Sequence, residues 1–324
     1  MKYLVTGAAG FVGSHVTDEL LARGHAVIGL DNLSTGQERF LERARLSGRF
    51  TFLQADVLDA SALQRALEGV DVVYHMAANA DVRGSFASPR VDLEQNTVAT
   101  FEVLDAMRRA GTRRMAFASS AAALGEPDVF PTPEHCPIPT QTSLYGASKM
   151  AGEGLVAAYC EGYGFEGYAF RFVSLLGPRY PHGHVFDFVR QLLDDPARLR
   201  VLGDGSQRKS YLHVSDCVRA MLHITEEVRP AHRPERRFEA YHLGVPAFCH
   251  VRESARWICD EMRVTPRVEF GTGTRGWVGD SPFVFLDVAK AMSTGWAPEH
   301  SIEASVRETV RWLLDNRWIF ERRR

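Results

Sequence analysis

Tyr145 and Lys149 stand four residues apart, a spacing that places both side chains on one face of a helix. An ammonium group beside a phenol favours the phenolate, so we expect Lys149 to lower the pKa of Tyr145 and allow the tyrosine to act as a base. Ser119 and Ser120 precede this pair and supply hydroxyl groups at the end of an expected strand. The combination predicts a site that takes a proton from a hydroxyl while the carbon that bears it loses a hydride.

A glycine-rich turn near the beginning of the sequence is suited to the dinucleotide that would accept this hydride. Gly7, Gly10 and Gly13 lie between an apolar segment at residues 3–6 and a helical pattern over residues 11–23. Glycines at this spacing allow a tight turn, close approach to a pyrophosphate and packing of the helix on the strand. The amides at the start of the helix would face the phosphates.

Asp31 predicts which dinucleotide binds. It lies at the end of the second expected strand, where a carboxylate accepts hydrogen bonds from the ribose hydroxyls and repels a 2′-phosphate. NAD is therefore favoured over NADP, although Asp31 could also be a surface residue in a turn. Asp56 and Val57 follow the third strand, where adenine would lie, and the small side chains of Ala77 and Ala78 leave room for the dinucleotide to pass.

The elements that must position these residues alternate regularly in the first half of the sequence. This alternation of strand and helix predicts an α/β fold with a Rossmann-type, doubly wound parallel sheet and a smaller C-terminal α/β substrate lobe. We place the NAD-binding domain at residues 1–174 with return segments near 211–245, and the substrate lobe at 175–210 and 246–324. The expected strands are 3–6, 26–30, 51–53, 70–75, 114–118, 167–172 and 211–214, with a strand and turn at 201–205. The expected helices are 11–23, 60–67, 93–110, 143–161, 185–193, 249–262 and 301–316, with an exposed insertion at 229–237.

The composition is that of an ordinary globular protein. The 324 residues are 45% hydrophobic and 24% charged with a net charge of −2, so nothing favours binding to nucleic acid or to an acidic membrane. We expect no membrane span and no signal peptide, because the first apolar strand begins at once. The five widely spaced cysteines predict reduced thiols in a cytoplasmic protein. Arg322–Arg324 is expected to be a solvated basic helix end.

A metal site is not expected. His182 and His184 could suggest one, but no cysteine or carboxylate cluster near them in the sequence completes a set of ligands.

With these residues identified, nearly the whole chain resembles the extended short-chain dehydrogenase/reductase family, and within it the nucleoside-diphosphate-sugar 4-epimerases of the UDP-galactose (UDP-glucose) 4-epimerase type. The markers are residues 6–13, 31–36, 75–78, 96, 119–120, 145–149, 171–172, 177–178, 203–207 and 211–214. The resemblance implies a catalytic triad of Ser120, Tyr145 and Lys149, with Asn96 as a supporting helix residue. The cofactor-binding residues that we predict from the turn and the resemblance are Gly7, Gly10, Phe11, Val12, Gly13, Asp31, Asn32, Ser34, Thr35, Gly36, Asp56, Val57, Ala77, Ala78, Asn96, Tyr145 and Lys149.

The resemblance also implies residues that hold a nucleotide sugar. Arg275 matches an arginine that clamps the diphosphate with its forked donors, and Asp280 matches an acid near the ribose. Relatives pair as homodimers through helices that match 93–110 and 143–161, so a homodimer is expected. The predicted substrate-binding residues are Arg83, Ser85, Ser120, Tyr145, Ser174, His184, Val185, Lys209, Tyr211, Arg275 and Asp280.

Departures from the family pattern bear on the chemistry and the substrate. Ala121 and Ala122 follow Ser120, where the related 4,6-dehydratases carry an aspartate and a glutamate that eliminate water. Alanine cannot do this, which leaves the reversible oxidation at one carbon that epimerisation requires. Ser174 stands where these epimerases usually carry asparagine, and Leu124 replaces a usual tyrosine, so the base and the sugar of the substrate stay open.

Three functions are compatible with these residues. The leading one is an NAD-dependent epimerase that inverts the C4 hydroxyl of a nucleoside-diphosphate sugar through a 4-keto intermediate. The second is a nucleotide-sugar reductase or dehydrogenase of the same family. The third is a non-catalytic protein that senses dinucleotides, which the intact pair of Tyr145 and Lys149 disfavours.

Overall fold

The computed structural model of the protein describes residues 1–137, 140–228 and 237–321. The insertion expected at 229–237 lies outside the described residues except for Arg237, and the basic end Arg322–Arg324 lies outside them entirely.

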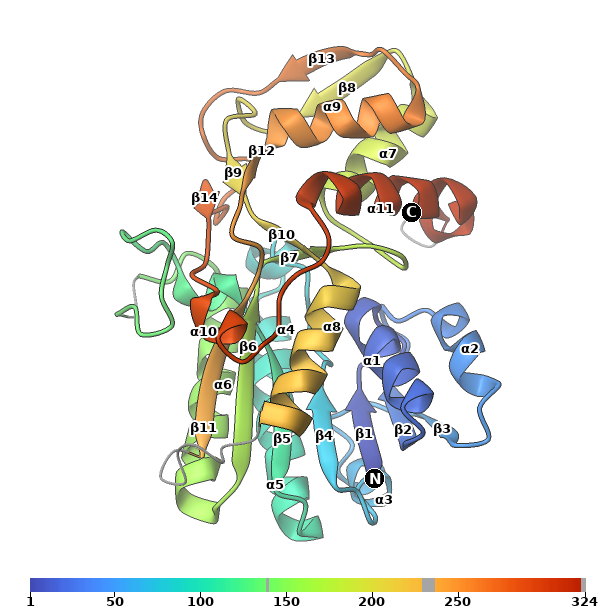
Figure 1. The fold of residues 1–324 in the computed structure, drawn as a ribbon, viewed down its shortest axis with the longest axis vertical. Helices are drawn as coiled ribbons and strands as arrows, with labels where there is room; N and C mark the ends of the chain where they lie inside the picture. Colours follow the sequence, from blue (N-terminus) through green and yellow to red (C-terminus); the bar gives the residue numbers. More distant parts are fainter. Residues whose placement is uncertain (138–139, 229–236, 322–324) are drawn as a thin grey trace.

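A seven-stranded parallel sheet forms the larger part of the molecule (Figure 1), as the alternation of strand and helix predicts. Each strand pairs in parallel with its neighbours, so the carboxyl ends of all seven lie at one edge, where open α/β sheets bind ligands. In spatial order the strands are β11 (Phe238–Leu243), β6 (Glu166–Phe172), β5 (Arg114–Ser120), β4 (Val72–His75), β1 (Lys2–Thr6), β2 (Ala26–Asp31) and β3 (Phe50–Gln54).

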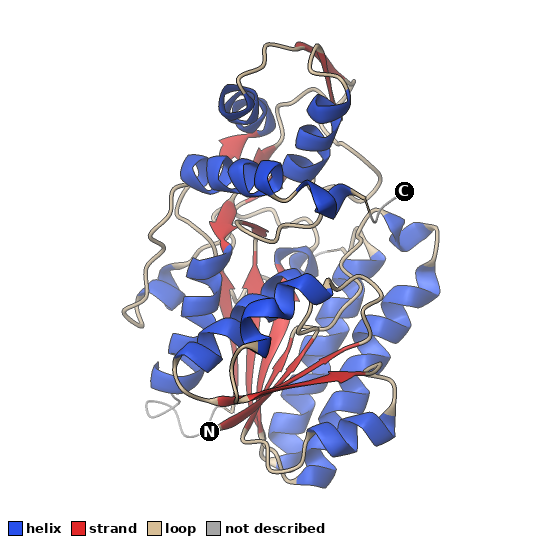
Figure 2. Ribbon diagram, turned by 90° about the vertical axis from the view of Figure 1, so that its right-hand side faces the viewer, coloured by secondary structure: helices blue, strands red, loops and turns tan. Residues whose placement is uncertain are grey.

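Helices cover both faces of this sheet (Figure 2). Because successive side chains of a strand point to opposite faces, Tyr3 and Val5 of β1 pack into one core cluster and Leu4 into the other. The first cluster includes side chains of α1 (Phe11–Ala22) and α8 (Val214–Leu222), and the second those of α3 (Ala60–Ala66), α5 (Ala99–Ala110) and α6 (Leu144–Tyr163). The short helices α2 (Glu42–Arg45), α4 (Pro89–Asp92) and α10 (Ala289–Met292) lie in the connections.

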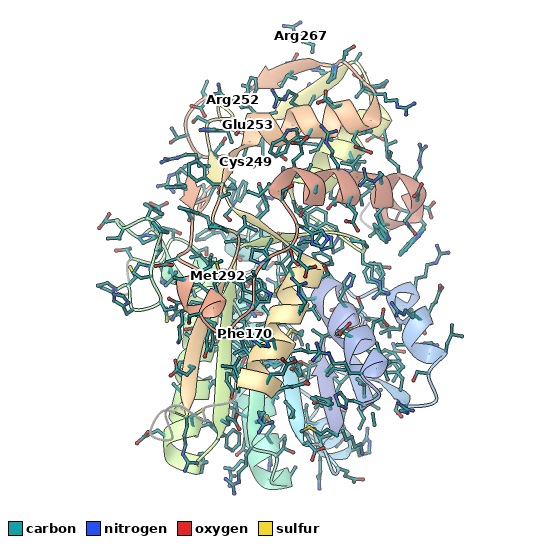
Figure 3. The ribbon with its side chains drawn as sticks, in the orientation of Figure 1. Phe170, Cys249, Arg252, Glu253, Arg267 and Met292 are labelled. Atoms are coloured by element: carbon teal, nitrogen blue, oxygen red, sulfur yellow. The ribbon has the colours of Figure 1, made fainter. Side chains whose placement is uncertain are left out.

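A smaller α/β part lies beyond the carboxyl edge of the sheet (Figure 1). Figure 3 places Phe170 in the large sheet and Cys249, Arg252 and Glu253 in this smaller part, where β12 leads into α9. Its helices are α7 (His184–Asp194), α9 (Val251–Met262) and α11 (Ile302–Asp315), and its strand pairings are β7 (Ser174–Leu176) with β10 (Tyr211–His213), β8 (Arg198–Val201) with β13 (Arg267–Phe270), and β9 (Arg208–Lys209) with β12 (Cys249–His250) and β14 (Phe283–Val284).

Most predicted elements agree with the structure to within one or two residues at each end, and three differences have a visible cause. Of the strand and turn expected at 201–205, only Val201 belongs to a strand, as the last residue of β8, because Gly203 and Gly205 have positive φ angles of 71° and 74° that turn the backbone. The helix expected at 93–110 begins with a π-helical segment, Leu93–Val98, before α5. The helix expected from residue 249 begins at Val251, because His250 caps it and pairs in β12.

All five cysteines are free thiols, and four of them are buried. In the described part of the chain, we find no helix with both the length and the apolar character needed to cross a membrane.

Candidate active site

The glycine turn has the close contacts that its sequence predicts. Gly7 has a φ of +67°, and a Cβ atom on it would lie 2.7 Å from the backbone nitrogen of Ala77. A Cβ on Gly13 would lie 2.0 Å from the carbonyl oxygen of Gly7. Helix α1 begins at Phe11, with Val12 in its first turn and Gly10 as its N-cap, so its first amides face the carboxyl edge of the sheet.

Asp31 ends β2 and accepts two backbone hydrogen bonds, from Ala9 at 2.9 Å and from Leu33 at 2.8 Å. Burial raises the pKa of this carboxyl group, while the two amides act in the opposite direction. Asp31 therefore has a fixed orientation beside the glycine turn, where a ribose would lie.

The loop after Asp31 is tied to the loop after β3. The amide of Asn32 donates to Asp56 at 2.7 Å, and its oxygen accepts from the backbone of Ser34 at 2.9 Å. Val57 is buried next to Asp56. Thr35 and Gly36 continue this loop, and a Cβ on Gly36 would lie 2.7 Å from Asp31 Oδ1. Ala77 and Ala78 follow β4 at the same edge of the sheet.

Helix α6 carries Tyr145 in its first turn and Lys149 one turn later. The helix begins after Ser143, whose hydroxyl accepts from the amide of Gly146 at 3.0 Å. Both side chains are buried, with 8% of Tyr145 and 3% of Lys149 exposed. Lys149 Nζ donates to the carbonyl oxygen of Ala118 at 2.8 Å and lies 5.8 Å from the centre of the Tyr145 ring.

Ser120 completes the predicted triad. It is the last residue of β5, and its hydroxyl accepts from the amide of Ala122 at 3.1 Å. Its hydroxyl group lowers the pKa of Tyr145, against the larger effect of burial.

The expectation that Lys149 lowers the pKa of Tyr145 is wrong for the protein without its dinucleotide. Burial raises the pKa of Tyr145 to about 12, with Asp92 adding to the effect, and this outweighs the hydrogen bond from Ser120. Burial also lowers the pKa of Lys149 to about 8. The lysine directs its ammonium group at a backbone carbonyl, so the protein itself keeps the tyrosine protonated at neutral pH.

Asn96 holds the loop after β4 against α6. Its side-chain oxygen accepts from the backbone of Asn79 at 2.8 Å, and its amide donates to Ser148 at 2.8 Å and to Asp92 at 3.2 Å. Only 1% of Asn96 is exposed. Through these contacts Asn96 joins the loop after β4 to Ser148, the residue before Lys149.

Glu153, which the sequence did not suggest, anchors α6 to the sheet one turn after Lys149. Its carboxylate accepts from Ser119 of β5 and, through both oxygens, from Arg171 of β6, with Arg171 Nη2 at 2.6 Å. Glu153 and Arg171 are both buried, so the charges are paired away from water.

Arg275, the predicted diphosphate residue, is paired with Glu126. The two side chains form a two-pronged ion pair, with Arg275 Nη2 2.8 Å from Glu126 Oε2. Arg275 holds the pKa of Glu126 below its ordinary value. Glu126 follows Ser120 by six residues, so this contact joins the loop after β5 to the smaller part of the molecule.

Asp280, predicted to lie near the ribose, orders the loop that carries Arg275. Its oxygens accept from Lys209 Nζ at 2.8 Å and from the backbone of Gly276 at 2.9 Å. Lys209 and Asp280, which are both predicted to bind the substrate, thus contact each other. The loop that carries Arg275 and Asp280 also packs on the start of α6, since a Cβ on Gly279 would lie 2.8 Å from the carbonyl oxygen of Thr142.

Arg83 makes a second bridge between the two parts of the molecule. Its guanidinium contacts Asp187 of α7 at 2.5 Å and lies 5.2 Å from the ring centre of Trp277. Ser85 is buried and donates to the carbonyl oxygen of Asp81 at 3.2 Å, so its hydroxyl supports this loop.

His184 and Tyr211 lie together in the smaller part. Their rings stack with centres 4.8 Å apart, and His184 Nε2 is 2.7 Å from the hydroxyl of Ser254. Burial lowers the pKa of His184 to about 3, so this imidazole is neutral at physiological pH. Val185 is buried beside it, whereas Ser174 at the start of β7 is exposed.

Several residues of this region could not be found by sequence patterns. Glu126 and Trp277 belong to no spacing motif, and they are identified by their contacts with Arg275 and Arg83. Glu153 follows Lys149 by four residues, so the helical spacing was a usable signal for its position on the same face.

The site combines a glycine turn at the end of β1, a carboxylate at the end of β2, Ser120 at the end of β5, and Tyr145 and Lys149 on α6. These features together define a dinucleotide-dependent enzyme of the Rossmann type. The chain belongs to the NAD dependent epimerase/dehydratase family, whose profile matches residues 3–244.

Known proteins resemble the chain over nearly its whole length. The UDP-glucose 4-epimerase of Mycolicibacterium smegmatis is 32% identical, over 97% of this chain and 98% of that protein. The UDP-glucuronate 4-epimerase of Thermodesulfobacterium geofontis is 28% identical, over 97% of this chain and 96% of that protein. A crystal structure of a UDP-galactose 4-epimerase matches with a TM-score of 0.87 and 35% identity, over 98% of this chain and all of that one.

Proposed function

We propose that this protein is an NAD-dependent 4-epimerase of a UDP-hexose. The observation that carries the proposal is the burial of Tyr145 and Lys149, with Lys149 bonded to the carbonyl oxygen of Ala118 near the carboxyl end of β5, two strands from the glycine turn that follows β1. Similarity to UDP-sugar 4-epimerases over nearly all of the chain supports the same conclusion.

In the proposed mechanism, Tyr145 receives the proton of the sugar 4-hydroxyl and later returns it. Ser120 hydrogen-bonds the 4-oxygen and stabilises it as the carbonyl forms. NAD supplies the hydride acceptor and, when bound, a positive ring charge. Burial raises the pKa of Tyr145 to about 12. The positive charge of Lys149 alone is therefore not sufficient to form the phenolate at neutral pH, and the positive ring of bound NAD would lower this pKa further. The predicted cofactor residues, from Gly7 to Ala78 along the carboxyl edge, would hold the dinucleotide.

The residues after Ser120 favour epimerisation over elimination. Ala121 and Ala122 carry no acid or base, so nothing at these positions can assist the loss of water from the sugar. The 4-keto sugar can then only take the hydride back, on either face.

A neutral hexose fits the charges better than a uronic acid. Arg83 is paired with Asp187 and Arg275 with Glu126, so both arginines predicted to face the substrate already have carboxylate partners. The diphosphate would compete for Arg275, and a second anion on the sugar would need a further cation. UDP-glucose and UDP-galactose are therefore the proposed pair of substrates.

The test is NMR of UDP-glucose, UDP-galactose and UDP-glucuronate incubated separately with the enzyme. Interconversion of the first two with unchanged mass, and with a deuterium label at C4 retained, supports the proposal. A mass change of two hydrogens with stoichiometric change of NADH would indicate a reductase or dehydrogenase. Conversion of UDP-glucuronate alone would assign a uronate epimerase, and tight NAD binding without any reaction would indicate a sensor.

We also propose a homodimer that pairs through α5 and α6, in the cytoplasm. The apolar side chains of Leu93, Val98 and Phe101 are exposed along the segment that leads into α5, by 56%, 37% and 43%. A row of exposed apolar residues on helices is a feature of protein interfaces. The domain boundaries that we propose are 1–174 with 211–245 for the cofactor side and 175–210 with 246–324 for the substrate side. They divide the smaller part at β10 (Tyr211–His213), which pairs with β7.

A further inference from the structure

One buried carboxylate near Tyr145 and Lys149 has no part in the proposed chemistry. Asp92 is the last residue of α4, and only 1% of it is exposed. Helix α4 and the π-helical segment that follows it pack against α6, which carries Tyr145 and Lys149. Asp92 therefore lies in the interior, on an element that contacts the helix of the proposed base and its lysine.

The hydrogen bonds of Asp92 come from neutral groups. Its Oδ1 accepts from the side-chain amide of Asn79 at 2.9 Å and from that of Asn96 at 3.2 Å. Among the described residues, no group forms a hydrogen bond with its buried Oδ2. Amides orient a carboxylate without neutralising its charge, and a buried polar atom without a partner calls for an explanation.

The other groups around Lys149 do little to balance its positive charge. Its Nζ donates to the carbonyl oxygen of Ala118, which is neutral. Glu153 acts on the lysine as well, but both of its oxygens are bound to the guanidinium of Arg171. His75 of β4 also faces Lys149, and burial and the lysine lower the pKa of this imidazole to about 3, so it is neutral at physiological pH. The net negative charge that these groups present to the ammonium is therefore small.

We propose that Asp92 is a positioning residue whose carboxylate is the counter-charge of the Lys149 ammonium group and keeps this lysine charged beside Tyr145. The inference rests on the function proposed above. A buried ammonium needs an opposite charge that acts through the same low-dielectric interior. In agreement, burial lowers the pKa of Lys149 to about 8, and Asp92 opposes this shift more strongly than Glu153 does.

The same carboxylate acts on Tyr145 in the opposite sense. It adds to burial in raising the pKa of the phenol, whereas Ser120 lowers it. Asp92 thus keeps the lysine charged and the tyrosine protonated in the protein alone. The phenolate then forms only when a further positive charge, such as the ring of bound NAD, acts on the tyrosine.

The experiment measures the pKa of Lys149 in the full chain by NMR of protein labelled with ¹³C at lysine Cε. The sequence has four lysines, Lys2, Lys149, Lys209 and Lys290, so Lys149→Met assigns the signal. In Asp92→Asn, which keeps the shape of the side chain, the pKa of Lys149 should fall by about one pH unit or more, because the opposite charge is lost. Asp92→Ser removes the same charge and should give the same shift, which keeps the test valid if one of the two variants does not fold.

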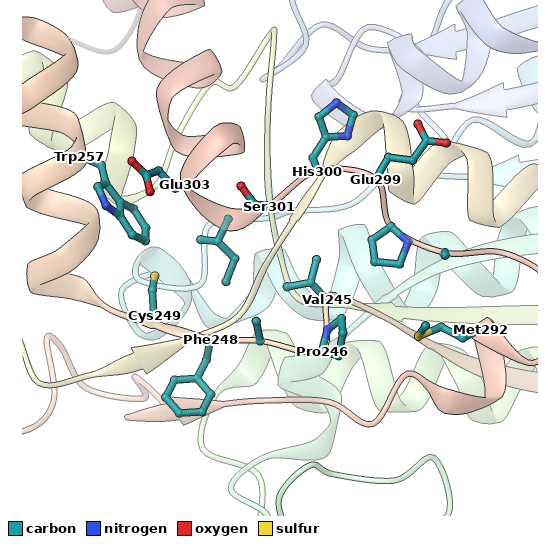
Figure 4. A pocket seen from close by; sticks show the side chains of 14 residues that line it. Val245, Pro246, Phe248, Cys249, Trp257, Met292, Glu299, His300, Ser301 and Glu303 are labelled. Atoms are coloured by element: carbon teal, nitrogen blue, oxygen red, sulfur yellow. The ribbon is translucent and has the colours of Figure 1, made fainter.

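Two other carboxylates provide matched controls. Glu94 lies two residues after Asp92, in a partly exposed pair with Arg90 at 2.6 Å. Glu303 lines a pocket of about 480 Å³ at the start of α11 (Figure 4). Glu94→Gln and Glu303→Gln each remove one negative charge and should leave the pKa of Lys149 within about 0.3 pH unit of the parent value, because exposed charges are screened by solvent.

The pH dependence of the rate adds a second readout. In Asp92→Asn the kcat profile should move to lower pH, because the tyrosine ionises earlier and the lysine loses its charge earlier, whereas a merely structural change would lower kcat without moving the profile. A chain that turns over no UDP-hexose would refute the proposed function, and the NMR titration would still test Asp92. An unchanged pKa of Lys149 in both Asp92 variants would overturn the inference, and so would an equal shift in Glu94→Gln.

Discussion

Glu126 and Arg275 are 149 residues apart in the sequence, yet they form a two-pronged ion pair that joins the loop after β5 to the smaller part of the molecule. A diphosphate that binds Arg275 must take the place of a carboxylate that already occupies its donors. The pair would therefore oppose the binding of a diphosphate at Arg275 while it holds the arginine in a defined orientation.

Replacing Glu126 by glutamine should lower KM for the nucleotide sugar. Because the carboxylate that competes for Arg275 belongs to a partly exposed pair, its loss should lower KM by about two- to fivefold, with little change in kcat. Glu38→Gln, in an exposed pair with Arg45 at 2.6 Å, is the control and should leave KM unchanged. An increase in KM for Glu126→Gln would show that the glutamate orients Arg275 rather than competing for it.

Tyr145→Phe should lower kcat by about 10²- to 10⁴-fold, because it removes the group proposed to transfer the proton. The buried ring keeps its volume, so the fold and the binding of NAD should persist. Steady-state kinetics and the NAD content of the purified variant measure the two effects. A variant that retains more than a tenth of the rate would exclude Tyr145 from proton transfer.

The depressed pKa of Lys149 predicts how stability depends on pH. Between a folded pKa of about 8 and the ordinary value of 10.5, the unfolded chain binds the proton more strongly, so this residue makes the folded state more stable as pH rises. The difference in unfolding free energy, parent minus Lys149→Met, should increase by about 2–3 kcal/mol from pH 7 to pH 10. Denaturant unfolding at both values measures it, and a difference that stays constant would contradict the buried ammonium.

Gly13→Ala should abolish NAD binding and destabilise the fold, because its methyl group would lie 2.0 Å from the backbone oxygen of Gly7. Gly154→Ala is the contrasting variant. A Cβ there meets nothing within 4 Å in the middle of α6, so alanine should stabilise the protein by about 1 kcal/mol. Thermal unfolding with and without NAD distinguishes the two, and equal effects would contradict this account of the turn.

Phe101→Glu should convert the proposed dimer into a monomer, because it places a charge in the exposed apolar row, where the row reaches α5. Analytical ultracentrifugation of the parent and the variant measures the change. Glu102→Gln on the same helix is the control. A parent that is monomeric at micromolar concentration would rule out the interface.

Local patterns were sufficient to predict the fold and the candidate catalytic residues. The spacing of Gly7, Gly10 and Gly13 and that of Tyr145 and Lys149 follow from one turn and one helix, so the sequence displays them directly. Contacts such as that of Glu126 with Arg275 depend on how distant loops meet, and no local pattern encodes them. In the protein without NAD the pKa of Tyr145 is raised rather than lowered, because burial, which is a property of the whole fold, outweighs the local contacts.

The contact of Glu153 with Ser119 and Arg171 has a consequence for how a hexose could be inverted. This carboxylate fixes α6 to two neighbouring strands, and rotating the helix would expose an unpaired charge in the interior, at a cost of about 3–5 kcal/mol. In the proposed mechanism, Tyr145 would therefore meet the sugar from a single direction. The half-turn that exchanges the two faces of the ketone would then have to be made by the sugar, by rotation about the bond to its diphosphate.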